Sequence, residues 1–208
     1  MAIARAALAA CGVDASIDAV LARAGAWERV FHGNPSGIDT AAAAVGGCFR
    51  FSRAGGVRPI ALARELTLCI GWTGASSSTK VMVEGLARLK ARKPEVVDPA
   101  IAGITSLVDN AALALEAGDL EGFGRLMDLN QMILAGVLLS TERIEALCAL
   151  ARGAGAFGAK LTGAGGGGSV LALVGGPAEA ERVLAAWRGA GFDGFVARIH
   201  PTAEKTAS

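Results

Sequence analysis

The sequence predicts an α+β fold in which helices cover one face of an antiparallel sheet. From residue 66 onward, apolar segments follow the order strand, several helices, strand, glycine-rich loop, strand, helix, strand. The chain of 208 residues is 52% hydrophobic and 19% charged, which is typical of a globular protein. Much of the apolar content is alanine, so we expect helices packed closely on the sheet.

The first sixty residues have a different pattern from the rest of the chain. They contain too few strands to form a sheet of their own. We therefore expect two parts, residues 1–60 and residues 61–208. In the first part the periodicity predicts helices at 2–11 and 16–31, a short helix at 39–44, a strand at 45–51, a turn at 54–56 and a partner strand at 57–61.

Capping residues set most helix boundaries in the second part. Asp98 is the expected N-cap of a helix with Pro99 in its first turn, and Gly118 ends that helix. Asp119 is expected to cap the next helix, and Ser140 to open the one after it. The remaining elements are a strand at 66–72, a helix at 79–89, strands at 159–162 and 169–174, a helix at 177–189 and a strand at 192–200.

Charge and composition disfavour several classes of function. The net charge is +1 without a basic block, so no nucleic-acid partner is expected. We find no apolar run of about 18 residues and no signal-peptide pattern, so no membrane segment is expected. The four cysteines lack metal-ligand spacing and are expected to be buried thiols in a reducing cytoplasm: Cys11, Cys48, Cys69 and Cys148.

The sequence at 160–168 is Lys-Leu-Thr-Gly-Ala-Gly-Gly-Gly-Gly, directly before an apolar strand. Five of these nine residues lack a side chain, which is entropically costly unless something approaches the backbone closely. That neighbour would be a phosphate held by backbone N–H groups, or another loop that holds one; a flexible hairpin turn is the alternative. The pattern is neither a Walker A loop nor a dinucleotide fingerprint. Lys160 could contact a phosphate, although a solvated lysine at a strand end is favoured.

A second loop, His32-Gly-Asn-Pro-Ser-Gly-Ile-Asp39, consists of turn-forming residues. It could hold the Asp39 carboxylate to accept a proton from a substrate hydroxyl, although from its position a helix cap is favoured. Glu28 precedes it on a predicted helix and could bind Mg²⁺ with phosphate oxygens, or be a surface charge. His32 is expected to anchor the loop rather than bind a ligand.

A third loop, at 74–80, is crowded with hydroxyl groups before a predicted helix. One of these hydroxyls should cap the helix. Ser78 or Thr79 could instead face an anion at the helix N-terminus.

Together the three loops resemble those of the mevalonate kinases, a family of the GHMP kinase superfamily. The resemblance covers nearly the whole chain and implies a two-lobed fold, with a nucleotide-binding N-terminal lobe and a ferredoxin-like C-terminal α+β domain. It implies phosphoryl transfer from ATP, with Mg²⁺, to the C5 hydroxyl of mevalonate in isoprenoid biosynthesis. A cytoplasmic enzyme is expected, and a homodimer is left open.

The resemblance also implies roles for individual residues. Asp39 matches the catalytic aspartate, Glu28 the magnesium-binding glutamate, and Thr79 a threonine near the phosphates and the substrate. The residues that match the loop buttressing the phosphate-binding region run from Gly163 to Gly168, and those expected to contribute to cofactor binding are Gly163, Ala164, Gly165, Gly166 and Gly167.

The chain departs from the family at its beginning. The family's N-terminal lysine and its Pro-x-x-x-Gly-Leu-Gly-Ser-Ser-Ala phosphate loop have no counterpart here. We therefore expect an incomplete N-terminal lobe, whether as a fragment, through a late start codon or through natural truncation, and little kinase activity from this chain alone. The alternatives are another GHMP kinase acting on a sugar or on phosphomevalonate, and a catalytically silent binding module.

Overall fold

The computed structural model describes residues 9–12, 19–20, 26, 37–52 and 54–201. The chain divides into two compact units, Met1–Ile60 and Ala61–Ser208. The helices predicted at 2–11 and 16–31 lie largely outside the described residues. The described elements of the first unit are helix α3 (Ile38–Val45) and an antiparallel hairpin of β1 (Phe49–Ser52) and β2 (Gly56–Pro59), as the sequence predicts.

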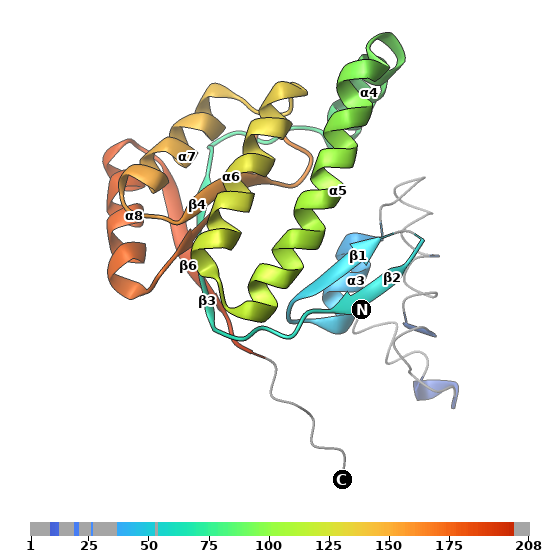
Figure 1. Cartoon of the computed structure of the whole chain (residues 1–208), viewed down its shortest axis with the longest axis horizontal. Helices are drawn as coiled ribbons and strands as arrows, with labels where there is room; N and C mark the ends of the chain where they lie inside the picture. The colour runs from blue at the N-terminus through green and yellow to red at the C-terminus, as the bar shows by residue number, and fades with distance from the viewer. Residues whose placement is uncertain (1–8, 13–18, 21–25, 27–36, 53, 202–208) are drawn as a thin grey trace. The chain divides into compact units, whose positions relative to one another are not determined.

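The second unit contains a four-stranded antiparallel sheet in the order β4-β5-β3-β6 (Figure 1). The predicted α+β class is therefore confirmed. The strands are β3 (Leu66–Trp72), β4 (Gly158–Thr162), β5 (Ser169–Val174) and β6 (Asp193–Ile199). The helices are α4 (Thr79–Arg92), α5 (Pro94–Ala117), α6 (Leu120–Gly136), α7 (Glu142–Gly153) and α8 (Pro177–Gly189).

The main hydrophobic core lies between α7, α8 and one face of the sheet. Trp187 of α8 is fully buried there, and its indole Nε1 donates a hydrogen bond to the carbonyl oxygen of Leu147, at 2.9 Å. The ring fits over Gly71 and Gly194, which are opposite each other on β3 and β6. A Cβ on either glycine would lie about 2.9 Å from the ring, so the two strands need glycine here.

Helix α6 covers the outer edge of β4. Asp128 Oδ1 accepts a hydrogen bond from the N–H of Ala159 at 2.9 Å, and Gln131 Oε1 accepts one from the N–H of Leu161 at 2.8 Å. These two N–H groups belong to an edge strand and would otherwise be available to another chain. Side chains of α6 thus take the place of a fifth strand at this edge.

Several predicted helix boundaries are confirmed. Gly118, with a φ of 72°, ends α5, and Asp119 caps α6 by accepting a hydrogen bond from Gly122 N–H at 2.8 Å. The predicted start at Asp98 is wrong, because α5 begins at Pro94 and contains Pro99 in its interior. A proline in the first helical turn removes no helical hydrogen bond, and Pro94 occupies that position. Pro99 lies further inside the helix and lacks the N–H for one backbone hydrogen bond.

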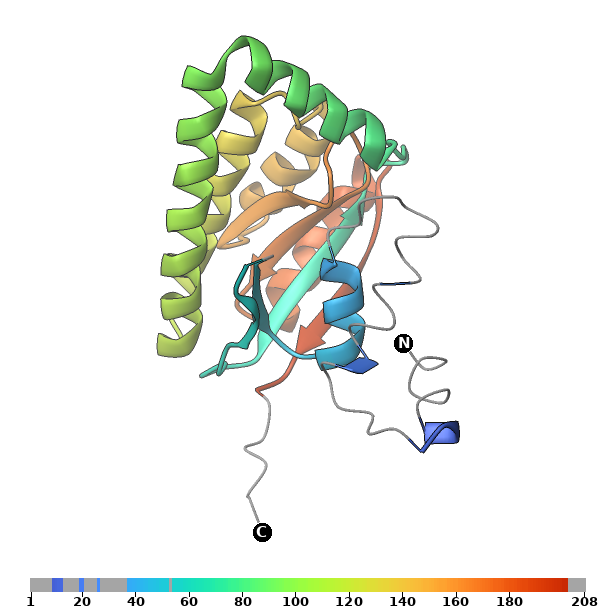
Figure 2. The same ribbon diagram turned by 90° about the vertical axis from the view of Figure 1, so that its right-hand side faces the viewer.

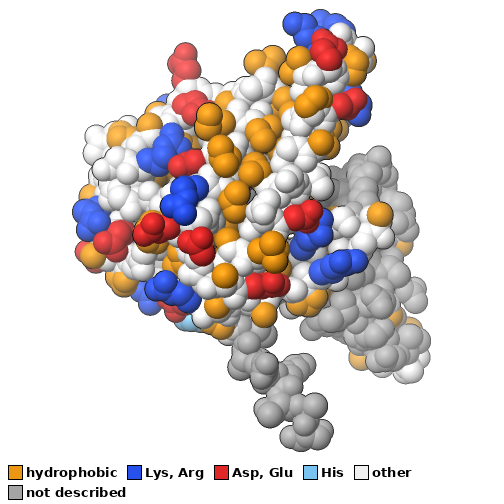
Figure 3. Space-filling view, viewed as in Figure 1, with side chains coloured by type: hydrophobic (Ala, Val, Ile, Leu, Met, Phe, Trp, Pro, Cys, Tyr) orange, Lys and Arg blue, Asp and Glu red, His pale blue; other side chains and the backbone are white. Residues whose placement is uncertain are grey.

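Helix α5 is more exposed than its composition suggests. It packs beside α6 and meets α4 at Lys93, where the chain turns sharply (Figure 2). Its outer surface and that of α6 carry exposed apolar side chains (Figure 3). By length and composition α5 could cross a bilayer, although the sequence was expected to contain no apolar stretch long enough for this. Only 6% of the apolar 18-residue stretch of α5 is buried. One helix of this kind is weak evidence for a membrane segment.

Candidate functional site

The glycine loop connects β4 to β5 and takes its shape from backbone conformations that favour glycine. Positive φ angles occur at Gly163, Gly165, Gly166, Gly167 and Gly168. A Cβ at Gly165 would overlap the carbonyl oxygen of Leu139, and one at Gly167 would lie 2.9 Å from the carbonyl oxygen of Ala75. These glycines therefore allow the loop to lie directly against two other backbone segments.

Hydrogen bonds fix the loop against these segments. Gly166 N–H donates to the carbonyl oxygen of Leu139 and Gly168 N–H to that of Ala75, both at 2.8 Å. Thr73 N–H donates in return to the carbonyl oxygen of Gly168 at 2.9 Å. Two of the N–H groups that could have held a phosphate are thus engaged with protein. Of the readings left open by the sequence, contact with another loop fits these bonds better than direct phosphate binding by these two groups.

The hydroxyl-rich loop before α4 is the segment that the glycine loop contacts. Ser77 Oγ donates a hydrogen bond to the carbonyl oxygen of Gly165. Ser78 is the N-cap residue of α4, but its side chain makes no capping hydrogen bond, so the predicted hydroxyl cap is wrong. Thr79 is exposed and opens the helix directly after this contact. The loop's geometry is therefore set by the glycine loop rather than by a side-chain cap.

A pocket of about 350 Å³ opens beside the contact between the two loops. Arg143, from the first turn of α7, donates a hydrogen bond from Nε to the carbonyl oxygen of Thr73. Its guanidinium also lies 4.9 Å from the centre of the Phe192 ring. Arg143 could not be recognised from the sequence, because nothing in its neighbourhood distinguishes it from a surface arginine. The lining residues are Thr73, Ala75, Thr141, Glu142, Arg143, Gly166 and Gly167.

Lys160 differs from the solvated strand-end lysine that the sequence favoured, and its contact with a phosphate stays a prediction. Its Nζ donates to the carbonyl oxygen of Leu161 at 2.6 Å, and the side chain is partly buried. Burial lowers the pKa of this lysine, because desolvation disfavours the charged form. In this structure the ammonium group thus satisfies a neighbouring carbonyl and is not the fully solvated lysine that the sequence favoured.

Asp39 lies in the first turn of α3 and is exposed. The N-cap position belongs to Gly37, whose φ is 81°, so the favoured prediction that Asp39 caps the helix is wrong. Its carboxylate still lies near the positive end of the helix dipole. Glu28 and His32 lie outside the described residues, and those that are described contain no group of three or more potential metal ligands. The predicted magnesium site therefore stays a prediction.

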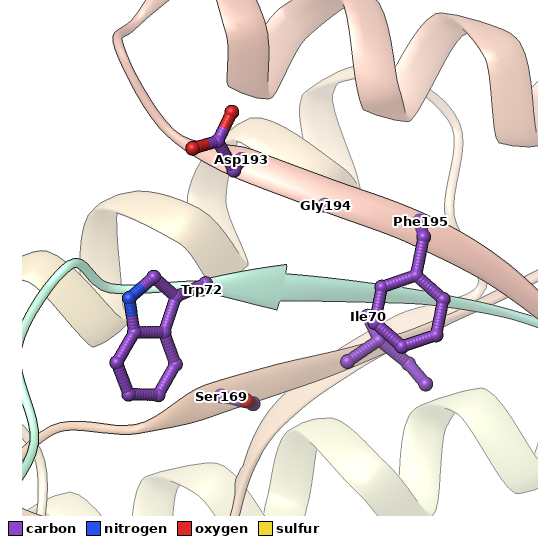
Figure 4. A pocket seen from close by; sticks show the side chains of 6 residues that line it. All are labelled: Ile70, Trp72, Ser169, Asp193, Gly194 and Phe195. Atoms are coloured by element: carbon purple, nitrogen blue, oxygen red, sulfur yellow. The ribbon is translucent and has the colours of Figure 1, made fainter.

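A second pocket, of about 360 Å³, lies on the sheet face opposite α7 and α8 (Figure 4). The Phe195 ring lies beside Ile70, and the Trp72 indole lies further along β3. Ser169, Asp193 and Gly194 complete the lining. Trp72 is 42% exposed and Phe195 is 60% exposed. This face of the second unit therefore presents apolar surface.

The cysteines differ from one another in environment. Cys69 and Cys148 are buried, and burial raises their pKa values to about 11 and about 12. Cys48 is partly buried, with a pKa also raised by burial. Cys11 is exposed, so the prediction that all four are buried is wrong for this residue. The two buried thiols are unreactive core residues.

Residues 111–193 match the family model described as GHMP kinases C terminal, which covers the C-terminal end of α5, the helices α6 to α8, and strands β4 and β5. Over these residues the chain is similar to GHMP kinase C-terminal domains, the class of domain that the glycine loop and the antiparallel sheet also indicate.

Within that class, the chain is similar to mevalonate kinases. It is 36% identical to that of Pyrococcus horikoshii over 177 residues, covering 83% of this chain and 52% of the relative. It is also 36% identical to that of Thermococcus gammatolerans over 151 residues, covering 70% of this chain and 45% of the relative. The chain thus spans about half the length of these curated relatives.

The fold is likewise similar to that of a solved mevalonate kinase. The crystal structure of the L. major enzyme in complex with R-mevalonate matches with a TM-score of 0.83 and 29% identity. The match covers 91% of this chain and 60% of that one. The predicted resemblance to the mevalonate kinases is confirmed by these comparisons, as is the GHMP kinase-like fold.

Proposed function

We propose that this chain provides the acceptor-side and C-terminal portion of a mevalonate kinase. The reaction would transfer the γ-phosphoryl group of ATP to the C5 hydroxyl of mevalonate, giving 5-phosphomevalonate and ADP. The observation that carries the proposal is the glycine loop, fixed against the hydroxyl-rich loop, in a chain 36% identical to mevalonate kinases. Phosphoryl transfer depends mainly on positioning and charge stabilisation, and rigid loops supply positioning.

In this proposal Asp39 accepts the proton of the attacking hydroxyl. It is exposed on α3 and its side chain is not used as a helix cap, which suits a carboxylate that must reach a substrate. Mg²⁺·ATP supplies the phosphoryl group, and Glu28 is proposed as a metal ligand. Thr79 stands at the N-terminus of α4, where N–H groups and the helix dipole favour an anion.

The glycine loop fits a supporting role toward the nucleotide. At Gly163 and Gly168 a Cβ would meet nothing within 4 Å, so open space lies beside the loop at both ends. The segment Gly163 to Gly168 is proposed to buttress the phosphate region through Ala75 and Ser77, and Gly163 to Gly167 to contribute to cofactor binding. We further propose a cytoplasmic enzyme that binds neither nucleic acid nor membrane and that could form a homodimer.

A chimera tests this function. It retains the unmatched portion of the Pyrococcus horikoshii mevalonate kinase and carries this chain in place of the matched portion. ADP release is measured with mevalonate, phosphomevalonate and galactose as acceptors. We expect turnover with mevalonate, and little turnover from residues 1–208 alone. A preference for another acceptor would favour a different GHMP kinase, and a folded chimera inactive on all three would favour a catalytically silent module.

Asp39→Asn in the same chimera tests the proposed base. Loss of the proton acceptor should lower kcat by about 10²–10⁴-fold and leave the KM for ATP nearly unchanged. The conservative surface change Glu116→Gln, at an exposed position of α5, is the control and should leave kcat unchanged. Full activity of the Asp39→Asn chimera would remove this residue from the mechanism.

A further inference from the structure

A buried polar cluster lies behind the glycine loop, at the junction of α6, α7 and β4. Its centre is Gln131 of α6, which is 2% exposed. The amide Nε2 donates to Ser140 Oγ at 2.9 Å and to Glu145 Oε1 at 2.8 Å, and the Ser140 hydroxyl donates to Glu145 Oε1 at 2.6 Å. Since Oε1 of the same amide faces the Leu161 N–H, every polar atom of the Gln131 side chain has a complementary partner.

The cluster contacts both supports of the glycine loop. Leu161 lies on β4, two residues before Gly163, and its N–H is bonded to Gln131 at 2.8 Å. Ser140 directly follows Leu139, whose carbonyl oxygen accepts the hydrogen bond from Gly166 N–H. One buried amide thus joins the strand that leads into the loop and the turn on which the loop rests.

The turn at 137–140 needs such a support, because its backbone is unfavourable on its own. Leu138 has a φ of 64°, the one positive value among the non-glycine residues that the structure describes. Its side chain is 73% exposed and therefore contributes little packing. Two hydrogen bonds hold the turn in place. Gln131 Nε2 donates one to Ser140 Oγ, and Leu139 N–H donates the other to the carbonyl oxygen of Leu134.

We propose that Gln131 is a positioning residue for the glycine loop: through Leu161 and through Ser140 it sets where the loop holds the segment 73–77. The importance of that segment for catalysis rests on the function proposed above, but the positioning itself does not. The same bonds account for the start of α7, because Ser140 is engaged in the cluster and Thr141, not the predicted Ser140, caps the helix.

Asp128 provides a matched control on the same helix. It also accepts a hydrogen bond from an edge N–H of β4, that of Ala159, but its side chain pairs with Arg152 at 3.0 Å and makes no bond to Ser140. Gln131→Met removes one bond to the β4 edge with little change in volume, and Asp128→Leu removes another at a partly exposed side chain that can accommodate the larger group. Only the first should release the glycine loop.

The test is amide hydrogen exchange of the whole 208-residue chain, followed by mass spectrometry. Exchange in the loop peptide 163–168 is referred to that of β5, so that a change in global stability cancels. Gln131→Met should accelerate loop exchange at least about tenfold, whereas Asp128→Leu should leave it within about twofold of wild type. Equal loop exchange in the two variants would overturn the proposal.

A charge-exchange pair keeps the test informative if Gln131→Met does not fold. Gln131→Glu retains an acceptor for Leu161 but sets a carboxylate against that of Glu145, so the loop should lose protection at pH 8. In Gln131→Glu/Glu145→Gln the donor and acceptor are exchanged, and protection should return at pH 8. Failure of this rescue would also overturn the proposal.

A final arm separates this inference from the proposed function. Mg²⁺ with tripolyphosphate is added to the wild-type chain during exchange. Additional protection at 73–79 would support a nearby phosphate site. Its absence would count against the phosphate role of these loops, while the comparison of Gln131→Met with Asp128→Leu would still decide the positioning role.

Discussion

At the scale of single residues, the glycine loop combines two distinct requirements. Gly163 and Gly165 have nearly equal φ angles, 86° and 85°, so both favour glycine for the same backbone reason. Only Gly165 is also enclosed, since an added Cβ would overlap the backbone of Leu139, whereas at Gly163 the space is open. Comparing Gly163 with Gly165 therefore distinguishes the cost of the backbone conformation from the cost of a steric overlap.

This difference predicts unequal costs of substitution by alanine. Gly163→Ala should lower the free energy of unfolding by about 1–2 kcal/mol, the cost of a left-handed conformation. Gly165→Ala should cost at least about 3 kcal/mol, because the Leu139 turn must also move. Urea denaturation of the 208-residue chain measures both. Equal losses of unfolding free energy would mean that the close contact with Leu139 adds nothing to the cost of the left-handed backbone conformation.

The sequence allowed some site residues to be identified but not their partners. The glycine run is recognisable because five residues without side chains require a reason. The partner of the loop is not, because Leu139 and Ala75 contribute carbonyl oxygens, and every residue has one. Gln131 was overlooked for a related reason: a glutamine on an apolar helix gives no sign that it will be buried and fully bonded.

At the scale of elements, the regular periodicities of the second unit predicted its helices and strands well. The elements from α6 to β6 lie within a few residues of the predicted ranges. The start of α5 was wrong because two prolines, Pro94 and Pro99, each resemble a first-turn residue, and local sequence cannot rank them. Coverage of the β4 edge by α6 was not foreseen, since it depends on tertiary contacts of Asp128 and Gln131.

Trp187 is the largest side chain by which helix α8 packs on the sheet, beside the buried Ala180 and Val183, and it leads to a prediction at this scale. Trp187→Phe removes the hydrogen bond to the carbonyl oxygen of Leu147 and part of the ring that fills the space over Gly71 and Gly194. The carbonyl of Leu147 keeps its bond within α7, so the loss of this second hydrogen bond together with the cavity should cost about 2–4 kcal/mol. Thermal unfolding followed by circular dichroism measures the loss.

Trp72→Phe is the control for this change. Trp72 is 42% exposed on the opposite sheet face, so the same chemical substitution should alter stability by no more than about 0.5 kcal/mol. A comparable loss in both variants would indicate that Trp187 contributes through general hydrophobicity. It would not support a specific fit between α8 and the two glycines.

At the scale of the whole molecule, the second unit presents two groups of exposed apolar side chains. One apolar surface contains Trp72 and Phe195 on the sheet, and another contains Leu113, Leu129 and Met132 on α5 and α6. The last three are 63%, 47% and 69% exposed, respectively. The relatives are about twice as long as this chain, so they contain additional residues that could cover one of these surfaces.

We therefore expect the 208-residue chain to self-associate at micromolar concentration, as light scattering coupled to size exclusion would show. Two pairs of substitutions identify the surface responsible. Trp72→Ser/Phe195→Ser should restore a monomer if the sheet face mediates association, and Leu129→Glu/Met132→Glu should do so if the helical face does. Each pair changes exposed side chains, so the fold should survive in both. A wild-type chain that is already monodisperse and monomeric would contradict the expectation, and would show that neither apolar surface requires a covering partner.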